Sequence, residues 1–300
     1  MIDGALLLDK PVGVSSNRAL QDAKKLYRAS KAGHAGTLDP LASGLLVVLF
    51  GEATKFAGPL LDDDKEYQAT LKLGERTTTG DAEGEVVERK SVAVAEAEIE
   101  AALARFRGDV DQVPPMHSAL KRDGVPLYAL ARKGQTVERA ARHVRIAALE
   151  KLGFEPPLLE LRVRCSKGTY VRTLAEDIGA ALGTCAHLAA LRRTASGRFS
   201  VQDAVAPDAL AAMAESERAR HLLALPELLA GLPRAELDAE QEARFRNGQK
   251  LKAFLPEGLC AVYGARGGVI GLGEADAAGT LRPLRLVAAS QTADKHRQTL

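Results

Sequence analysis

The sequence predicts an α+β fold, with helices and strands mixed around one sheet, followed by a second and smaller β-rich unit. Residues 67–73 and 159–165 alternate apolar and polar side chains, which is the pattern of half-buried strands. The apolar run 45–50 indicates a fully buried strand. Apolar residues at helical spacing between 17 and 29 indicate an amphipathic helix, and this mixture within one stretch of chain is typical of an α+β domain.

The chain begins with a short strand and a helix. Ala5 to Leu8 are apolar and predict the strand, and the Lys-Pro-Val-Gly sequence at 10–13 predicts a turn. Ser16 is a suitable N-cap for a helix over 17–29. One face of that helix is expected to be buried, with Ala19, Leu20, Ala23, Leu26 and Tyr27 on it.

The middle of the chain contains a strand, two helices and a basic segment. The strand over 159–165 leads through a turn into a helix whose buried stripe begins at Val171, so Arg172 is expected on its first turn. Residues 92–106 predict an acidic amphipathic helix. Residues 107–145 combine Gly, Pro and basic residues with few apolar runs, so this segment has little to bury.

A boundary between two units is predicted at about residue 230. The helix-prone stretch 208–230 ends at Gly231-Leu232-Pro233, which breaks the helical pattern. Short strand candidates separated by Gly-rich turns then predict a small β-barrel up to about residue 290, namely 260–263, 268–272 and 284–287. The polar residues from Gln291 onward predict a disordered tail.

The composition is that expected of a cytoplasmic protein. The chain has 300 residues, enough for one large domain and a small one, and its longest apolar run, 45–50, is far too short to span a membrane. The N-terminus lacks the basic start and apolar core of a signal peptide. Three widely spaced cysteines and six histidines form no ligand pattern, so neither a disulfide framework nor a metal site is expected.

The net charge is only +2, but charge is distributed unevenly along the chain. Residues 132–198 carry 13 Lys and Arg against 6 Asp and Glu, whereas residues 81–111 carry 9 acids against 4 bases. A basic surface with an acidic face elsewhere is what recognition of an RNA backbone would need. The alternative is that both regions are simply solvated faces.

Residues 33–44, Gly-His-Ala-Gly-Thr-Leu-Asp-Pro-Leu-Ala-Ser-Gly, place one carboxylate, Asp39, in a loop just before the predicted strand 45–50. Glycine permits backbone angles closed to other residues, and Pro40 fixes its own φ and favours an extended Asp39. The strand would hold the end of the loop rigidly, so the loop is suited to aim a side chain. Asp before Pro is also common in ordinary turns, so the loop alone leaves both interpretations open.

Motifs along most of the chain resemble, in the same order, those of the TruB family of tRNA pseudouridine-55 synthases. The motifs are residues 8–16, 33–44, 65–69, 79–84, 114–121, 165–175 and 191–193, so the resemblance spans roughly residues 4–200. Residues 245–249 and 279–283 resemble, more weakly, the PUA-like domain at the C-terminus of bacterial members. A barrel that merely packs on the first unit is the alternative for that region.

The resemblance implies a mixed α/β pseudouridine synthase domain over residues 1–230, built around a largely antiparallel sheet. It also implies an RNA-binding insertion at about 107–145 and a PUA-like RNA-binding domain over 231–290. The implied activity is isomerisation of uridine 55 in the tRNA T loop, with the base flipped out of the RNA. The family works without a cofactor or metal, and the expected partner is tRNA, bound by a monomer without a protein partner.

Three residues match the catalytic positions of the family. Asp39 matches the aspartate that the reaction needs as nucleophile or base, and Arg172 matches its basic partner. Tyr67 matches the tyrosine that stacks on the flipped base and takes part in proton removal from C5. The alternative for Arg172 is a surface salt bridge at the start of a helix, and the alternative for Tyr67 is a residue of the core.

Other residues match positions that bind the substrate. His34 matches the histidine that fills the gap left by the flipped base, Lys10 a residue that supports the active-site loop, and Tyr170 and Leu191 residues of the uracil pocket. Basic residues of the insertion would contact phosphates: Lys121, Arg122, Arg132, Lys133, Arg139 and Arg142.

Two other functions fit part of the pattern. A glycosidase or base-excising glycosylase would also direct a carboxylate at an anomeric carbon, but a retaining glycosidase needs a second carboxylate about 5 Å away. The motifs place no second acid beside Asp39. A non-catalytic tRNA-binding or tRNA-folding factor would need the basic segment and the barrel but not Asp39.

Overall fold

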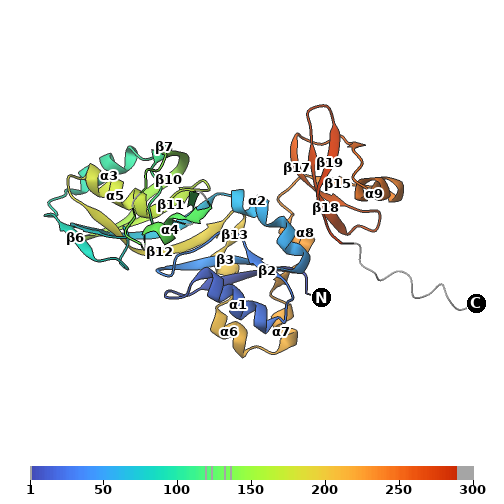
Figure 1. The fold of residues 1–300 in the computed structure, drawn as a ribbon, viewed down its shortest axis with the longest axis horizontal. Coiled ribbons are helices and arrows are strands. Elements are labelled where there is room, and N and C mark those ends of the chain that lie inside the picture. Colours follow the sequence, from blue (N-terminus) through green and yellow to red (C-terminus); the bar gives the residue numbers. More distant parts are fainter. Residues whose placement is uncertain (1, 119, 123, 132, 136, 289–300) are drawn as a thin grey trace, which may run out of the picture.

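The computed structural model describes residues 2–288 except 119, 123, 132 and 136, and the side chains of 121, 122, 126 and 128 are likewise outside the described part. The molecule is elongated, with a large mixed α/β body and a smaller sheet at one end (Figure 1). No helix in the described part is long and apolar enough to cross a membrane. The predicted tail from Gln291 lies outside the described residues.

A ten-stranded sheet runs through the large body. Its strands lie in the order β14 (Leu222–Leu223), β1 (Gly4–Lys10), β3 (Ala42–Phe50), β12 (Ala186–Ser196), β4 (Lys65–Leu73), β11 (Leu158–Cys165), β10 (Arg142–Glu155) and β7 (Gly108–Gln112), with β2 (Ala32–His34) beside β3 and β13 (Phe199–Ser200) beside β12. These neighbours pair antiparallel except β3 and β12, which run parallel. The expected largely antiparallel sheet is confirmed.

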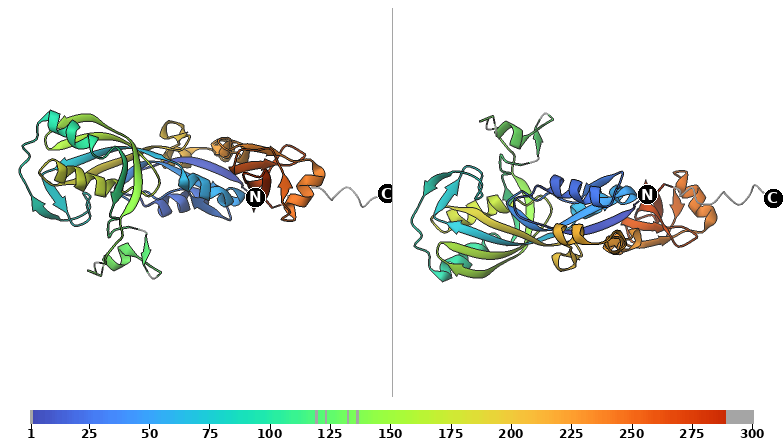
Figure 2. Two further views of the ribbon diagram at one scale, coloured as in Figure 1. Left: turned by 90° about the horizontal axis from the view of Figure 1, so that it is seen from above. Right: turned by 90° about the horizontal axis from the view of Figure 1, so that it is seen from below.

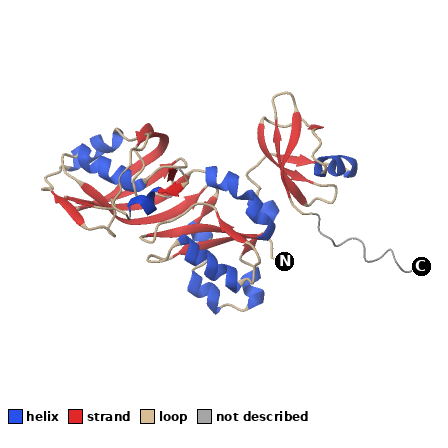
Figure 3. Cartoon of the chain, viewed as in Figure 1, coloured by secondary structure: helices blue, strands red, loops and turns tan. Residues whose placement is uncertain are grey.

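Helices cover the two halves of this sheet separately (Figure 3). Around β1 and β3, α1 (Ser16–Leu26) and α6 (Pro207–Ala212) enclose one apolar core, with α7 (Glu215–Ala219) next to them. Around β4, β10 and β11, α3 (Glu96–Ala104) and α5 (Val171–Ala181) enclose another. Between the two cores, β12 pairs with β3 on one side and with β4 on the other. The pair of β3 and β12 is the parallel one.

Two sequence predictions at helix ends are wrong. Ser15, not Ser16, is the N-cap of α1, because its hydroxyl accepts the Arg18 amide at 3.2 Å while Ser16 is buried beneath a loop. The acidic helix predicted over 92–106 is shorter, Glu96–Ala104. It begins where the carboxylate of Glu98 accepts the amide of Ala95, whose backbone is extended.

The segment predicted as an insertion, 107–145, begins and ends in the large sheet. Its first strand, β7, pairs with the start of β10, and the chain between them carries β8 (Lys121–Arg122), β9 (Val125–Pro126) and α4 (Leu127–Ala131). Figure 2 shows this part, in green, projecting away from the body. A further hairpin, β5 (Glu75–Thr77) with β6 (Val86–Arg89), follows β4.

The second unit is a curled five-stranded sheet, which confirms a small β-rich unit. Its order is β15 (Arg234–Glu236), β17 (Gly258–Tyr263), β18 (Val269–Ala275), β19 (Thr280–Leu286) and β16 (Leu251–Lys252), with α9 (Ala239–Arg246) beside it. The linking elements are α8 (Leu225–Leu228) and the 3₁₀ turn η2 (Val201–Asp203).

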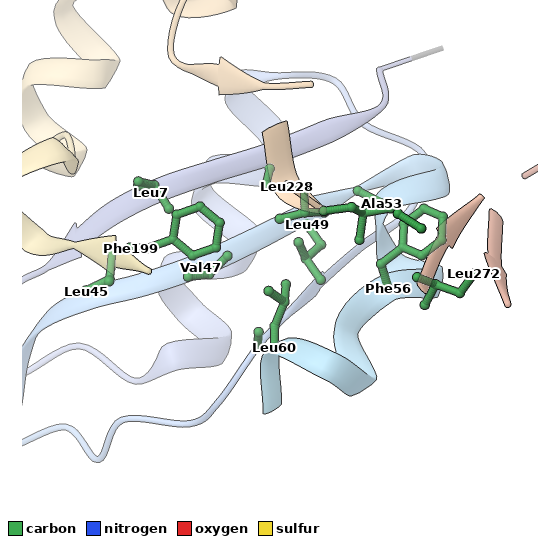
Figure 4. Close-up of a cluster of buried hydrophobic side chains, with 14 of the residues drawn as sticks. Leu7, Leu45, Val47, Leu49, Ala53, Phe56, Leu60, Phe199, Leu228 and Leu272 are labelled. Atoms are coloured by element: carbon green, nitrogen blue, oxygen red, sulfur yellow. The ribbon is translucent and has the colours of Figure 1, made fainter. Parts of the chain in front are cut away.

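The second sheet packs on the first through a shared apolar core. The chain leaves β3 into η1 (Gly51–Phe56) and α2 (Ala57–Asp62), and Phe56 meets Leu272 of β18 (Figure 4). At the edge of this contact, Lys55 Nζ donates to the Leu286 carbonyl at 2.9 Å. The two sheets are therefore joined by buried apolar surface and not only by a linker.

Candidate active site

A cleft of about 650 Å³ opens where the loop before β3, the start of β4 and the start of α5 converge. It is lined by six of the residues predicted from the sequence: His34, Asp39, Tyr67, Tyr170, Arg172 and Leu191. The first three of these residues precede the last three by more than a hundred residues of sequence. The fold therefore gathers most of the predicted site in one concave place, as expected of a ligand site.

The loop that carries Asp39 is fixed from several sides. Gly36 and Gly44 both have φ near +100°, which side chains disfavour, and a Cβ on Gly44 would collide with the backbone of Arg193 in the paired strand β12. The Ser16 hydroxyl accepts the Leu38 amide at 2.8 Å and donates to its carbonyl at 2.9 Å. The Gly13 amide donates to the Pro40 carbonyl at 2.7 Å. Asp39 thus lies between two anchored neighbours.

The Asp39 carboxylate meets a buried guanidinium. Arg172 Nη2 lies 3.0 Å from Asp39 Oδ2, with the Arg172 side chain 9% exposed and the Asp39 side chain 50% exposed. The same guanidinium donates to the backbone carbonyls of Thr79, at 3.2 Å, and His117, at 2.6 Å. Arg172 is therefore held by its own partners and presents a fixed surface to a carboxylate that remains open to the cleft.

A second acid shares this arginine, which corrects the expectation that no other carboxylate stands near Asp39. Asp81 Oδ2 lies 3.5 Å from Arg172 Nη1, and the Asp81 side chain is 4% exposed. Its other oxygen accepts the Thr79 hydroxyl at 2.5 Å and the Glu83 amide at 3.1 Å. Because these partners are far from Asp39 in the sequence, only folding reveals the pair. Asp81 is committed to bonds within the protein, whereas Asp39 is available to a ligand.

Tyr67 lies half-buried on the inner face of β4, as predicted, and lines the cleft. Burial raises the pKa of its phenol, and the nearby guanidinium of Arg193 opposes that shift. The ring therefore offers a neutral apolar face with one polar tip at neutral pH.

Two polar groups in the cleft have no partner in the described structure. They are Nδ1 of His34 and the hydroxyl of Ser118, whose residue is only 5% exposed. Burial and the Arg193 charge lower the pKa of His34, so its ring is neutral at neutral pH. Unpartnered buried groups at a cleft wall are suited to bind a ligand. Ser118 lies in the motif at 114–121, but the sequence predicts no role for it because its hydroxyl is placed in the cleft only by the fold.

The other predicted site residues lie outside the cleft or outside the described part. Lys10 is fully buried beneath the loop, where its ammonium donates to the carbonyls of Pro11 and Val14 at 2.8 and 2.6 Å. Arg142 is exposed at the start of β10. Arg132 is outside the described residues, and Lys121 lies in β8 with its side chain outside the described part.

The buried Lys10 predicts a pH dependence of stability. Burial lowers its pKa from 10.5 to about 8, and the Asp39 charge opposes this shift. Between these two pH values, Lys10 is protonated in the unfolded chain and has released its proton in the folded chain. The free energy of unfolding therefore rises with pH over this range. In urea unfolding, we expect wild type to gain stability relative to Lys10→Met from pH 8 to 10.5, with a constant difference below pH 7. A constant difference throughout would contradict it.

The cleft has no preformed metal site in the described part of the chain, where no cluster of three His, Cys, Asp or Glu could hold an ion. Its charged groups are Asp39, Arg172 and Asp81, with Glu83 at the rim. Desolvation and the charges of Asp81 and Asp39 raise the pKa of Glu83. The cleft therefore combines an accessible carboxylate, a buried cation paired with it, and the aromatic side chains of Tyr67 and Tyr170.

Comparison with known proteins identifies the family. Residues 24–171 match the family described as TruB family pseudouridylate synthase (N terminal domain), residues 172–232 the tRNA pseudouridylate synthase B C-terminal domain, and residues 233–287 the Pseudouridine synthase II TruB, C-terminal. A tRNA pseudouridine synthase B from Burkholderia mallei is 55% identical over 294 residues, which cover 95% of this chain and 97% of that protein. This chain belongs to the TruB family. A tRNA pseudouridine synthase B from Ralstonia nicotianae is likewise 55% identical over 296 residues, covering 95% of this chain and 94% of that protein.

Solved structures agree with this TruB family assignment. A crystal structure of a Cbf5-Nop10-Gar1 complex contains a chain that superimposes with a TM-score of 0.71 at 27% identity, covering 91% of this chain and 78% of that chain. A structure of an H/ACA RNP bound to a substrate RNA containing 2'-deoxyuridine gives a TM-score of 0.73 at 24% identity, covering 96% and 86%. The second likeness shows a common fold.

Proposed function

We propose that this protein converts uridine to pseudouridine in tRNA, at position 55 of the T loop, with Asp39 as the reactive group. The observation that carries the proposal is the pair formed by Asp39, open to a nucleoside-sized cleft, and Arg172, buried behind it. The names and similarity of the TruB relatives support tRNA as the substrate. Position 55 rests on the family alone.

The reaction needs what these residues supply. The N1–C1′ bond of uridine breaks, the uracil turns, and a C5–C1′ bond forms, while C5 loses a proton and N1 gains one. Asp39 can attack C1′, add to C6 or remove a proton from C2′, since each step requires an ionised carboxylate. When a base fills the cleft and displaces water, the attraction between Arg172 and Asp39 strengthens and holds the carboxylate in place.

The target base must leave its stack before it can reach Asp39. Unstacking costs a few kcal/mol, and an aromatic partner can return about 1 to 3 kcal/mol per base. Tyr67 offers such a face from the wall of the cleft, while the neutral ring of His34 can occupy the gap in the RNA. Tyr67 can also receive the C5 proton as a phenolate, after its own proton has passed to water; burial disfavours that ionisation and the Arg193 guanidinium favours it.

Substitutions at Tyr67 separate these two roles. We expect Tyr67→Phe to bind tRNA as wild type does but to lose most product formation, because the ring remains while the proton acceptor is lost. We expect Tyr67→Leu to lose binding of the flipped base as well. Single-turnover rates and tRNA affinities of both variants test this, and equal behaviour of the two would exclude a stacking role.

We further propose that residues 1–230 form the catalytic domain, that its insertion at 107–145 grips the T arm, and that residues 231–290 form an RNA-binding domain. Arg142 is exposed at the base of the insertion, and arginine side chains bind phosphates. This supports the proposal that the insertion grips the T arm. We expect a monomer acting where tRNA is found, in the cytoplasm. Hydroxyl-radical footprinting of bound tRNA tests the RNA contacts, and protection confined to the anticodon arm would contradict them.

The decisive test follows tritium at C5 of uridine in an unmodified tRNA transcript. We expect wild type to release one equivalent of tritium per tRNA, with no change in the mass of the RNA apart from the label. Release of free uracil would instead support a glycosylase, for which Glu83 with its raised pKa is the available acid. Tight tRNA binding without release of tritium would support the non-catalytic tRNA-folding factor.

A further inference from the structure

Beneath the Asp39 loop lies a fully buried arginine, Arg193, to which the sequence assigns no role. It is 1% exposed and lies in β12. Its Nε donates to the Leu45 carbonyl at 2.7 Å, and its Nη2 and Nη1 reach the carbonyls of Gly36 and Thr37 at 3.2 and 3.5 Å. A buried guanidinium is costly, so a cation that bonds to backbone carbonyls of β3 and of the Asp39 loop, beside the Tyr67 phenol, requires a reason.

The loop needs such a donor. Residues 35–41 have no helix or strand of their own, so their carbonyls require partners from elsewhere. On one side, Ser16 and Gly13 bond the backbone at Leu38 and Pro40. On the other side, the planar guanidinium of Arg193 donates both to the beginning of the loop and to β3. A lysine ammonium could not make these bonds with the same geometry.

Arg193 also connects the loop to the strand of Tyr67. In the sheet, Arg193 is paired with Tyr67 of β4 on one side and with Gly44 of β3 on the other. The glycine at 36 leaves room for the guanidinium, because a Cβ there would lie 3.3 Å from Arg193 Nη1. One side chain thus fixes the distance between the segment that carries Asp39 and the strand that carries Tyr67.

We propose that Arg193 is a positioning residue for the isomerisation, setting the Asp39 loop against Tyr67 without touching the substrate. This inference rests on the proposed function. Misplacing a reacting group by about 1 Å can cost about 100-fold in rate, so a small displacement of the loop is sufficient for a large effect. Loss of Arg193 should therefore slow the chemical step and leave tRNA affinity nearly unchanged.

Lys65 provides a matched control. It is also buried, at 7% exposed, and donates to three backbone carbonyls, those of Leu60, Leu61 and Asp63, at 3.0, 2.9 and 2.6 Å. Its ammonium serves the end of α2 and not the Asp39 loop. Lys65→Met removes a buried cation of the same kind and keeps the stem that packs near Gly36.

The experiment compares wild type, Arg193→Lys, Arg193→Met and Lys65→Met by thermal melting, tRNA affinity and single-turnover rate with tRNA saturated. We expect all variants to melt at lower temperature, and only the Arg193 variants to lose rate, by about 100-fold with affinity within about threefold. A wild-type rate in a folded Arg193→Lys would overturn the proposal. A loss of rate in Lys65→Met equal to that of the Arg193 variants would also overturn it.

Hydrogen exchange of the amides from Ala35 to Ser43 gives a readout that does not require activity. We expect faster exchange in this loop for Arg193→Lys and unchanged exchange there for Lys65→Met. If wild type releases no tritium, the proposed function fails, whereas the exchange result still decides whether Arg193 fixes the loop. Unchanged exchange in Arg193→Lys would overturn the positioning role whatever the activity.

Discussion

Asp39→Asn is expected to lose pseudouridine formation by about 10,000-fold or more, as removal of a reacting group does in other enzymes, while still binding tRNA. An amide has the shape of the carboxylate but is neither a nucleophile nor a base at this centre. Because Arg172 keeps Asp81 and two carbonyls as partners, the fold should be nearly unaffected. Single-turnover tritium release and tRNA affinity, measured together, check the prediction.

The matched control for this variant is Asp22→Asn. Asp22 is 42% exposed and accepts from Arg18 at 2.7 Å, so it is a half-exposed carboxylate bonded to an arginine but outside the cleft. It should retain full activity, because an exposed pair contributes little. An Asp39→Asn protein within tenfold of wild type would mean that the carboxylate is not the reacting group.

Arg172→Lys is expected to lose activity by about 100-fold and to lower the free energy of unfolding by about 1 to 3 kcal/mol. The guanidinium bridges two carboxylates and two carbonyls, and a single ammonium cannot reach all four. Buried Asp81 would then be left underpartnered, which explains the loss of stability. Urea unfolding and single-turnover rates measure the two effects separately.

Arg192→Lys is the control for this second variant. Arg192 binds both oxygens of Asp9, at 3.0 and 2.8 Å, but its side chain is 39% exposed and does not line the cleft. We expect little change in rate. Near-normal turnover by Arg172→Lys would show that any buried positive charge suffices and that orientation of Asp39 does not matter.

The sequence predicted those parts of the site that carry local patterns. The Gly- and Pro-rich loop at Asp39, the alternation around Tyr67 and the turn before α5 are visible in short windows, and the structure brings these segments together. The long strand β12 was not predicted, because its apolar face is interrupted by the buried Arg193. Periodicity assigns a charged residue to the surface, so tertiary hydrogen bonding was needed to reveal it.

Long-range partners were the other omission. Asp81 lies in a Gly-rich turn whose composition fits any hairpin, and its contact partner Arg172 is distant in the sequence. The start of α3 was also predicted wrongly. The residues before it carry no signal that would stop a helix, and the helix begins at Glu96 because the Glu98 carboxylate accepts the Ala95 amide. Register and caps depend on contacts that the sequence pattern does not contain.

The strand that follows Asp39 also determines the geometry of the whole molecule. After β3, the chain enters η1, on which the second sheet rests through Phe56 and Leu272. The nine residues of β3, at about 3.3 Å each, span about 30 Å, and they pair with β12 at the start of the strand and with β1 along the rest. The Asp39 loop and the second sheet therefore lie toward opposite ends of β3, and the number of residues in that strand sets the separation between them.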